Sequence, residues 1–149
     1  MPLRPLRLCV ALSGGFFILD RIFKHLTLSA WRQPALLNRF LGWLPFHNPG
    51  VAFGLPLPNT VVVVATLPIL ALLIVALQKK LRARAPLGQL CALCCLIAGA
   101  GSNFLDRLFY HATIDYLLIF TGVFNLADFL IVAGLLWYML GAGTKHPPT

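Results

Sequence analysis

The stretch TVVVVATLPILALLIVAL, residues 60–77, has no charged side chain and is followed at residues 79–84 by the basic run KKLRAR. An uncharged apolar stretch of this length can cross the hydrocarbon core of a bilayer as a helix, which needs about 20 residues. Pro68 lies inside it, and membrane helices tolerate such a proline because neighbouring groups satisfy the freed backbone. The stretch therefore predicts a transmembrane helix with a basic end.

The composition of the whole chain supports a membrane protein. Its mean hydropathy is +0.85 and 11% of its residues are charged, whereas soluble domains contain about 25% charged residues. The N-terminal apolar stretch resembles a signal peptide but lacks a small-residue cleavage site, so we interpret it as a retained helix. We predict an all-α membrane protein in a single domain of 149 residues, with four transmembrane helices at about residues 6–25, 60–77, 87–108 and 123–141.

Basic residues are divided unequally between the two predicted sides of the membrane. One side has only Arg32 and Arg39 in its loops. The other side has Arg4, Arg7, Lys79, Lys80, Arg82, Arg84 and Lys145. The positive-inside rule then makes both termini cytoplasmic and turns residues 30–58 and 109–122 outward. The net charge of +8 is explained by these flanking residues, which favour anionic lipid rather than nucleic acid as the partner.

The four cysteines of the chain all lie in apolar stretches: Cys9, Cys91, Cys94 and Cys95. Neither a histidine nor a further cysteine lies near the last three, so small apolar packing is favoured over a metal site. The spacing indicates no disulfide framework. We predict neither a metal nor a cofactor.

The acidic residues of the chain are four aspartates, and each lies within or beside an apolar stretch: Asp20, Asp106, Asp115 and Asp128. An ionised carboxylate at the centre of a bilayer helix costs about 2.5 to 3.5 kcal/mol, so such residues usually have a function. The helical rise of about 1.5 Å per residue brings all four near the outer leaflet, with Asp115 in an outer loop. We therefore predict one polar site at that end of the bundle.

Polar residues in the predicted helices occur in pairs that share a helix face. The pairs are Asp20 with Lys24, Asn103 with Asp106, and Asn125 with Asp128. Arg107 adds a permanent cation with a planar set of donors. Such groups either hold a small bundle together by interhelical hydrogen bonds or belong to a site. The spacing alone leaves both interpretations open.

Asp115 and Asp128 differ from the other two aspartates because neither has a cation at helical spacing. Two such carboxylates in a partly dehydrated pocket share a proton, since one pKa rises and the other falls. One carboxylate then activates water while the protonated one polarises a carbonyl, as in aspartic proteases. The alternatives are a serine nucleophile at Ser13 or Ser102, a proton-coupled transporter and a non-enzymatic assembly subunit.

Five segments, in order, carry a resemblance to a known family. They are ILDRIFK (18–24), HNPGVAFG (47–54), GAGSNFLDR (99–107), ATIDYL (112–117) and FNLAD (124–128). They are similar to the motifs of signal peptidase II, the lipoprotein signal peptidase of bacteria, and the resemblance covers about residues 16–136. Two departures are that Ser102 replaces a common glycine, with little expected consequence, and that residues 115–125 form a short stretch, which implies a reduced lid.

The resemblance implies an aspartyl endopeptidase of the bacterial inner membrane. It would remove the signal peptide from lipidated prolipoproteins on the N-terminal side of the diacylglyceryl-cysteine, with Asp115 and Asp128 as the catalytic pair. It also implies a small β-cradle from Trp31 to Pro58 on the outer face, contact with phospholipid, and inhibition by peptide antibiotics of the globomycin type. The residues that would bind substrate or support the site are Asp20, Lys24, Asn48, Gly50, Phe53, Gly99, Asn103, Asp106, Arg107, Asn125 and Ala127.

Overall fold

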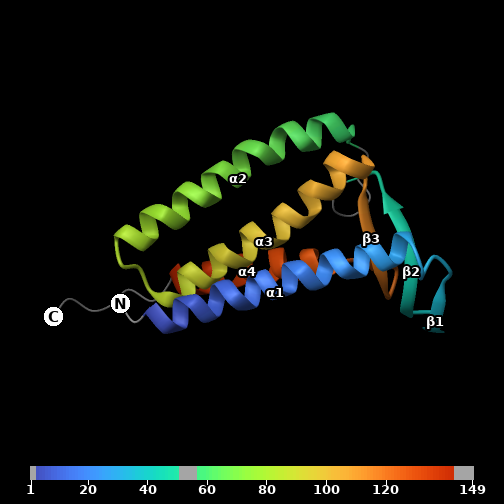
Figure 1. Cartoon of the computed structure of the whole chain (residues 1–149), viewed down its shortest axis with the longest axis horizontal. Coiled ribbons are helices and arrows are strands. Elements are labelled where there is room, and N and C mark those ends of the chain that lie inside the picture. The colour runs from blue at the N-terminus through green and yellow to red at the C-terminus, as the bar shows by residue number, and fades with distance from the viewer. Residues whose placement is uncertain (1–2, 51–56, 143–149) are drawn as a thin grey trace.

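The structure is a computed structural model that describes residues 3–50 and 57–142, and these form four helices and one small sheet. Figure 1 shows the helices along the long axis of the molecule and the sheet across one end. The helices are α1 (Leu3–Leu28), α2 (Asn59–Arg82), α3 (Leu87–Tyr110) and α4 (Leu126–Ala142). The strands are β1 (Ala35–Asn38), β2 (Leu41–Asn48), β3 (Thr113–Ile119) and β4 (Gly122–Phe124).

The helix α3 is central, since it packs against α1, α2 and α4. Gly99 allows α3 and α4 to approach closely, because a Cβ at this position would lie 2.6 Å from the carbonyl oxygen of Ala127. Small residues serve this purpose in membrane bundles, where close backbone contact drives helix association. This contact at Gly99 holds the first turn of α4 against α3. The helix α2 also packs against α3, and it has no buried residue.

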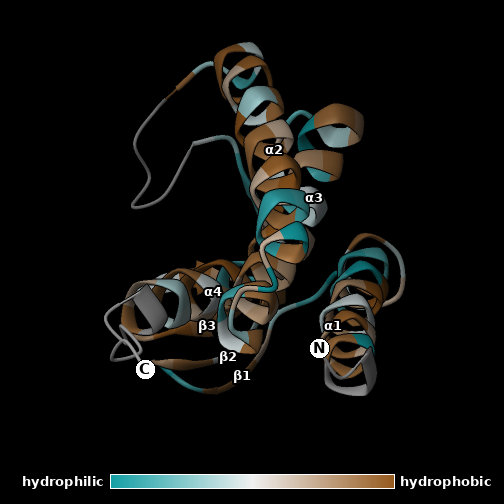
Figure 2. Cartoon of the chain, turned by 90° about the vertical axis from the view of Figure 1, so that its left-hand side faces the viewer, coloured by the Kyte–Doolittle hydropathy of each residue, from teal (hydrophilic) through white to brown (hydrophobic). Residues whose placement is uncertain are grey.

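Many apolar side chains of the helices are exposed, and Figure 2 shows that apolar residues make up most of the helix ribbons. Among the described residues, α2 and α3 are the two helices long and apolar enough to cross a membrane, while the apolar part of α4, Leu126–Leu140, is shorter. The buried side chains include Asp20, Lys24 and Asp106. An apolar exterior around a polar interior is typical of a protein that lies in lipid.

The sheet is antiparallel with the order β1-β2-β3-β4, so its centre is the pairing of β2 with β3. The predicted β-segment supplies β1 and β2, and residues 113–124 supply the other half. Asp115 therefore lies in a central strand opposite Phe46, and its predicted position in a loop is wrong. The fourth helix begins at Leu126 rather than near residue 123 because Gly122–Phe124 pairs with β3. Phe53 lies outside the described residues.

Two of the four cysteines differ from the prediction of apolar packing without a disulfide framework. Cys9 of α1 and Cys91 of α3 form a disulfide with a Cα–Cα distance of 5.3 Å, whereas Cys94 and Cys95 are free thiols. The pairing joins segments 82 residues apart. Spacing along the chain could not indicate it, because it follows from the contact between α1 and α3.

Candidate active site

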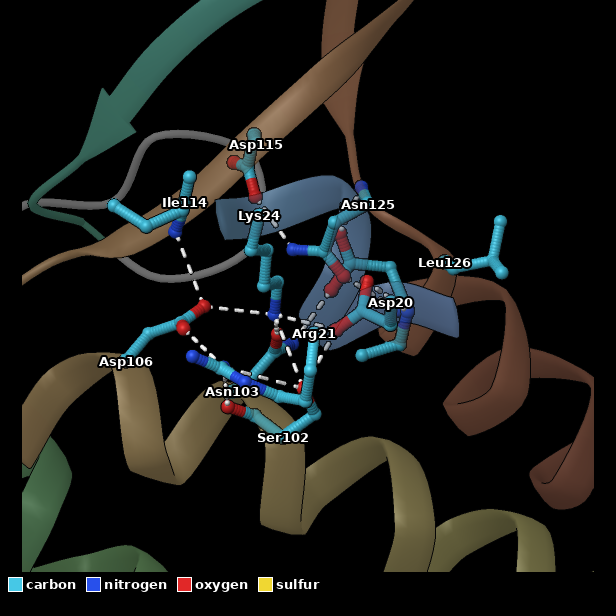
Figure 3. Close-up of polar contacts among 12 residues, drawn as sticks. Asp20, Arg21, Lys24, Ser102, Asn103, Asp106, Ile114, Asp115, Asn125 and Leu126 are labelled. Atoms are coloured by element: carbon cyan, nitrogen blue, oxygen red, sulfur yellow. Dashed lines mark hydrogen bonds and ion pairs between the residues drawn. The ribbon is translucent and has the colours of Figure 1, made fainter. Parts of the chain in front are cut away.

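The predicted convergence of the four aspartates is confirmed, since their side chains lie in one connected set of contacts. Figure 3 shows Asp20, Asp106 and Asp115 of this set. The set contains two parts. Asp115 and Asp128 are bound by amides, whereas Asp20 and Asp106 are bound by cations. The two parts differ in charge and in the chemistry available to them.

Asp115 is almost fully buried in β3 and accepts two hydrogen bonds from amides. The Nδ2 of Asn48, at the end of β2, donates to its Oδ2 at 2.9 Å, and the Nδ2 of Asn125 donates to its Oδ1 at 2.6 Å. Burial, followed by the negative charge of Asp128, raises the pKa of Asp115 from 3.8 to about 7, against the opposing effect of the two amides. Asp115 can therefore bind a proton near neutral pH.

Asp128 lies in the first turn of α4, where two groups donate to its carboxylate. The Nδ2 of Asn103 donates to Oδ1 at 2.8 Å, and the backbone N–H of Asn125 donates to Oδ2 at 3.1 Å. The Oδ1 of Asn125 accepts the backbone N–H of Asp128 at 2.9 Å in return. This reciprocal arrangement is a capping box, which fixes the carboxylate relative to the helix start.

Asn125 links the two carboxylates, because one side chain donates to Asp115 while its own backbone and Oδ1 hold Asp128. An amide that cannot lose its proton suits this place, since it supplies donors without adding charge. The pair consequently has donors on both members but no direct ion pair of its own within the described residues. Two acids in this arrangement can hold one proton between them.

Asp20 and Asp106 belong to a buried ionic cluster between α1 and α3. The Nζ of Lys24 lies 2.8 Å from the Oδ2 of Asp20 and 2.7 Å from the Oδ2 of Asp106. The guanidinium of Arg21 forms an ion pair with the Oδ1 of Asp106. Two cations thus balance two carboxylates, so the cluster is neutral. The spacing of Asp20 and Lys24 predicted their pairing, but not the bridge to Asp106.

The ionic cluster is connected to the carboxylate pair through Asn103. The Nζ of Lys24 donates to the Oδ1 of Asn103 at 2.8 Å, and the Nδ2 of that asparagine donates to Asp128. The cation orients the amide, because an Oδ1 that faces Lys24 must turn its Nδ2 toward the carboxylate. The position of the Asp128 carboxylate therefore depends, through Asn103, on the position of Lys24 in the cluster.

Ser102, for which little consequence was expected as a replacement for glycine, is part of the cluster. Its side chain is fully buried, and its Oγ donates to the Oδ2 of Asp20 at 2.6 Å. Its carbonyl oxygen also accepts a hydrogen bond from Arg21 at 3.2 Å. A glycine at this position would lack the hydroxyl and leave Asp20 with one donor fewer. The nearest signal in the sequence was the departure from the family pattern itself.

Arg107 lies apart from the ion pairs and faces the segment after β2. Its Nη2 donates to the carbonyl oxygen of Gly50, whose N–H in turn donates to the Oδ1 of Asn48 at 3.1 Å. The Nη1 of Arg107 is buried and has no partner within residues 3–50 and 57–142. A buried donor without an acceptor is costly, so an acceptor from outside the described residues is expected here.

Two residues of the network, Arg21 and Tyr116, were not among the residues that the sequence indicated, and Ser102 was considered only as an alternative nucleophile and as a departure from the family pattern. The hydroxyl of Tyr116 donates to the Oδ1 of Asp20 at 2.9 Å. Gly99 and Ala127, which were predicted to support the site, lie at the close contact of α3 with α4. Within the described part of the chain, no group of three or more His, Cys, Asp or Glu side chains is placed to hold a metal ion.

The chain is similar to known proteins over most of its length. The family described as signal peptidase (SPase) II matches residues 12–142. A lipoprotein signal peptidase of Moorella thermoacetica is 40% identical over 98 residues, which cover 63% of this chain and 65% of that protein. One from Methylobacterium sp. is 34% identical over 143 residues, which cover 89% of this chain and 87% of the relative.

Two solved structures share the fold. A bacterial membrane enzyme determined by the in meso method at 2.3 Å superposes with a TM-score of 0.77 at 18% identity and covers 95% of this chain and 94% of its own. A second, at 1.9 Å, has a TM-score of 0.75 at 22% identity over 93% of this chain and 94% of its own. At 18% and 22% identity, these similarities show a shared fold and nothing about the activity of this chain. The family match over residues 12–142 shows that the chain belongs to the signal peptidase II family and is a membrane-embedded peptidase.

Proposed function

We propose that this peptidase is an aspartic endopeptidase that removes signal peptides from prolipoproteins, with Asp115 and Asp128 as its catalytic pair. The observation that carries the proposal is the arrangement of these two carboxylates, which Asn125 joins and which form no ion pair with any cation among the described residues. The pair holds one proton up to about neutral pH, since the pKa of Asp115 is about 7. Prolipoprotein processing agrees with the names of the relatives, which are lipoprotein signal peptidases.

The reaction needs one ionised and one protonated carboxyl. The ionised member accepts a proton from water as the water oxygen attacks the scissile carbonyl carbon, and the protonated member donates a hydrogen bond to the carbonyl oxygen. A tetrahedral intermediate forms. Its collapse breaks the C–N bond, the leaving amine takes up a proton from the pair, and the carboxyl product departs. The pair returns to its single-proton state.

The remaining site residues bind substrate or hold the pair. The Nη1 of Arg107, which has no partner in the described part of the chain, is suited to a backbone carbonyl of the substrate. Asn48, Asn103 and Asn125 orient the two carboxylates through the hydrogen bonds described above. The other residues support the site through three sets of contacts. Asp20, Lys24 and Asp106 form the ionic cluster. Gly50 accepts the hydrogen bond from Arg107, and Gly99 and Ala127 form the close contact of α3 with α4.

The proposal extends to the membrane. The chain is one domain with four transmembrane helices in the bacterial inner membrane, both termini are cytoplasmic, and the sheet is a cradle at the outer leaflet. The first residues of α1 and the end of α4 lie opposite the sheet, which supports this orientation (Figure 1). The basic end of α2, with Lys79, Lys80 and Arg82, lies at the same end as these helix termini, as the positive-inside rule requires.

Labelling of single cysteines tests the orientation. In intact cells, a membrane-impermeant maleimide is expected to modify Gln33→Cys but to modify Lys79→Cys only after the membrane is permeabilised. The wild-type chain controls for reaction of the natural cysteines, of which Cys94 is buried. The reverse pattern would contradict both the orientation and an outer active site.

Cleavage by the purified chain in detergent tests the proposed function. A precursor with a diacylglyceryl group on its cysteine is expected to be cut directly before that cysteine, because the outer position of the site lets the lipid chains remain in the bilayer. A precursor with serine in place of the cysteine serves as the control and should remain intact. Equal cleavage of both would contradict recognition of the lipid, and cleavage of neither would contradict the proposed function.

Two further partners belong to the proposal. Phospholipid surrounds the apolar faces of the helices, and peptide antibiotics of the globomycin type compete with the precursor for the carboxylate pair. Competition would raise the KM for precursor without lowering kcat.

A further inference from the structure

Tyr116 connects the strand that carries Asp115 with the start of the helix that carries Asp128. Its side chain is fully buried, and its hydroxyl donates to the Oδ1 of Asp20 at 2.9 Å. The same hydroxyl accepts the backbone N–H of Leu126 at 3.0 Å. A phenol can both donate and accept, and here both capacities are used.

The first turn of a helix has N–H groups without a partner inside the helix. In α4 the N–H of Leu126 is taken by Tyr116, that of Ala127 by the Oδ1 of Asp20 at 3.2 Å, and that of Asp128 by the Oδ1 of Asn125. These contacts come from α1, from β3 and from the cap residue. Because Asp128 is the third residue of α4, a shift of this turn displaces its carboxylate.

The ring of Tyr116 is held firmly by aromatic neighbours. It stacks on Trp43 of β2 with a centroid distance of 4.8 Å and an interplanar angle of 24°. The ring of Phe23 from α1 meets it edge-on at 5.7 Å. Aromatic pairs in these geometries are favourable beyond the apolar area that they bury. Burial and then the charge of Asp20 raise the pKa of Tyr116, so its hydroxyl keeps its proton.

We propose that Tyr116 is a positioning residue, whose hydroxyl holds the first turn of α4 so that Asp128 faces Asp115. This inference rests on the proposed catalytic roles of the two aspartates. One strand then fixes both members of the pair: Asp115 through the backbone of β3, and Asp128 through the hydrogen bond from Leu126 to the neighbouring tyrosine. No substrate atom needs to touch Tyr116.

The variant Tyr116→Phe deletes the hydroxyl and keeps the ring. We expect kcat to fall by about tenfold or more, because small displacements of catalytic groups are costly. The KM should change little, since the groups proposed to bind substrate are untouched. The matched control is Tyr138→Phe, which removes the same atom from a tyrosine of α4 whose hydroxyl has no hydrogen bond within the described residues; it should behave as wild type.

The pH–rate profile separates positioning from loss of folded protein. The spacing of the two carboxylates sets their coupling, so Tyr116→Phe should move the two apparent pKa values of the profile toward each other. The charged groups that interact with the pair keep their charge in this variant: Asp20 and Lys24 of α1, and Arg107 of α3. Asp20 loses the hydrogen bond from the tyrosine but keeps its ion pair with Lys24. A folded Tyr116→Phe protein with wild-type kcat and pH profile would overturn the inference.

A double variant keeps the test decisive if Tyr116→Phe folds poorly. Leu126→Pro removes the N–H that the tyrosine accepts, and proline is favoured at the first position of a helix. In this background Tyr116→Phe is expected to cost much less kcat than in wild type. An equal loss in both backgrounds would overturn the inference. Failure of the single and the double variant to fold would do so as well, by assigning the hydroxyl to stability.

The same assay keeps this inference apart from the proposed function. If Asp115→Asn retains turnover, the catalytic pair is wrong whatever Tyr116→Phe does. If Asp115→Asn is inactive and Tyr116→Phe is normal, the pair stands and only the positioning role fails.

Discussion

Replacement of either Asp115 or Asp128 by asparagine is expected to lower kcat by at least about a hundredfold, the smallest effect typical of losing a general acid or base. The amide keeps the size of the carboxyl but can neither accept a proton from water nor share one with its neighbour. Both functions are needed in the same turnover. The two single variants should therefore be equally inactive, and the double variant no worse.

The control for this prediction is Asn38→Asp, which exchanges the same two groups at an exposed position of β1. The Oδ1 of Asn38 accepts the N–H of Phe40 at 2.8 Å, and an aspartate keeps that acceptor. Turnover of the lipidated precursor should be normal. The two-carboxylate mechanism would be contradicted if a correctly folded Asp115→Asn or Asp128→Asn enzyme kept more than about a tenth of wild-type turnover.

The pH dependence follows from the pKa of Asp115, which is about 7 in the folded protein and 3.8 in its ordinary state. A carboxyl whose pKa is raised by folding favours the folded state while it is protonated. Its contribution is complete below about pH 4 and is lost as the pH rises through about 7. Thermal stability should fall over this interval in wild type but not in Asp115→Asn. Turnover should decline above about pH 7 as the shared proton leaves, and again in acid as both carboxyls become protonated.

The second large effect is expected from Lys24→Met, which removes a buried cation and keeps much of its volume. Lys24 bridges Asp20 and Asp106, so its loss leaves buried negative charge that Arg21 alone cannot balance. Breaking a buried ion pair by removal of one partner costs about 3 to 5 kcal/mol. The free energy of unfolding should fall by that order, with a lower Tm in detergent.

Two comparisons make this prediction specific. Lys79→Met removes a cation from the exposed end of α2 and should leave the Tm unchanged. Asp20→Asn combined with Lys24→Met should recover part of the lost stability, because Asp106 keeps Arg21 while the other carboxylate is gone. A Lys24→Met protein as stable as wild type would show that the cluster does not hold α1 on α3.

The helices were predictable where a signal lay within one segment. The third predicted span, residues 87–108, agrees closely with α3, because hydropathy acts along a continuous helix. The fourth begins later than predicted since Gly122–Phe124 pairs with β3. Such pairing depends on a strand partner elsewhere in the chain, and the apolar character of these residues gave no sign of it.

The candidate site shows the same division. The cost of ionised groups in lipid identified the aspartates, and the spacing of four residues between Asp20 and Lys24 predicted their ion pair, since both follow from local chemistry. The second partner of Lys24, the hydroxyl of Ser102 on Asp20 and the contact of Tyr116 with Leu126 depended on the tertiary structure. These contacts form where α1, α3, β3 and the start of α4 pack together. The spacing of residues within one segment carries no information about which other segments pack against it.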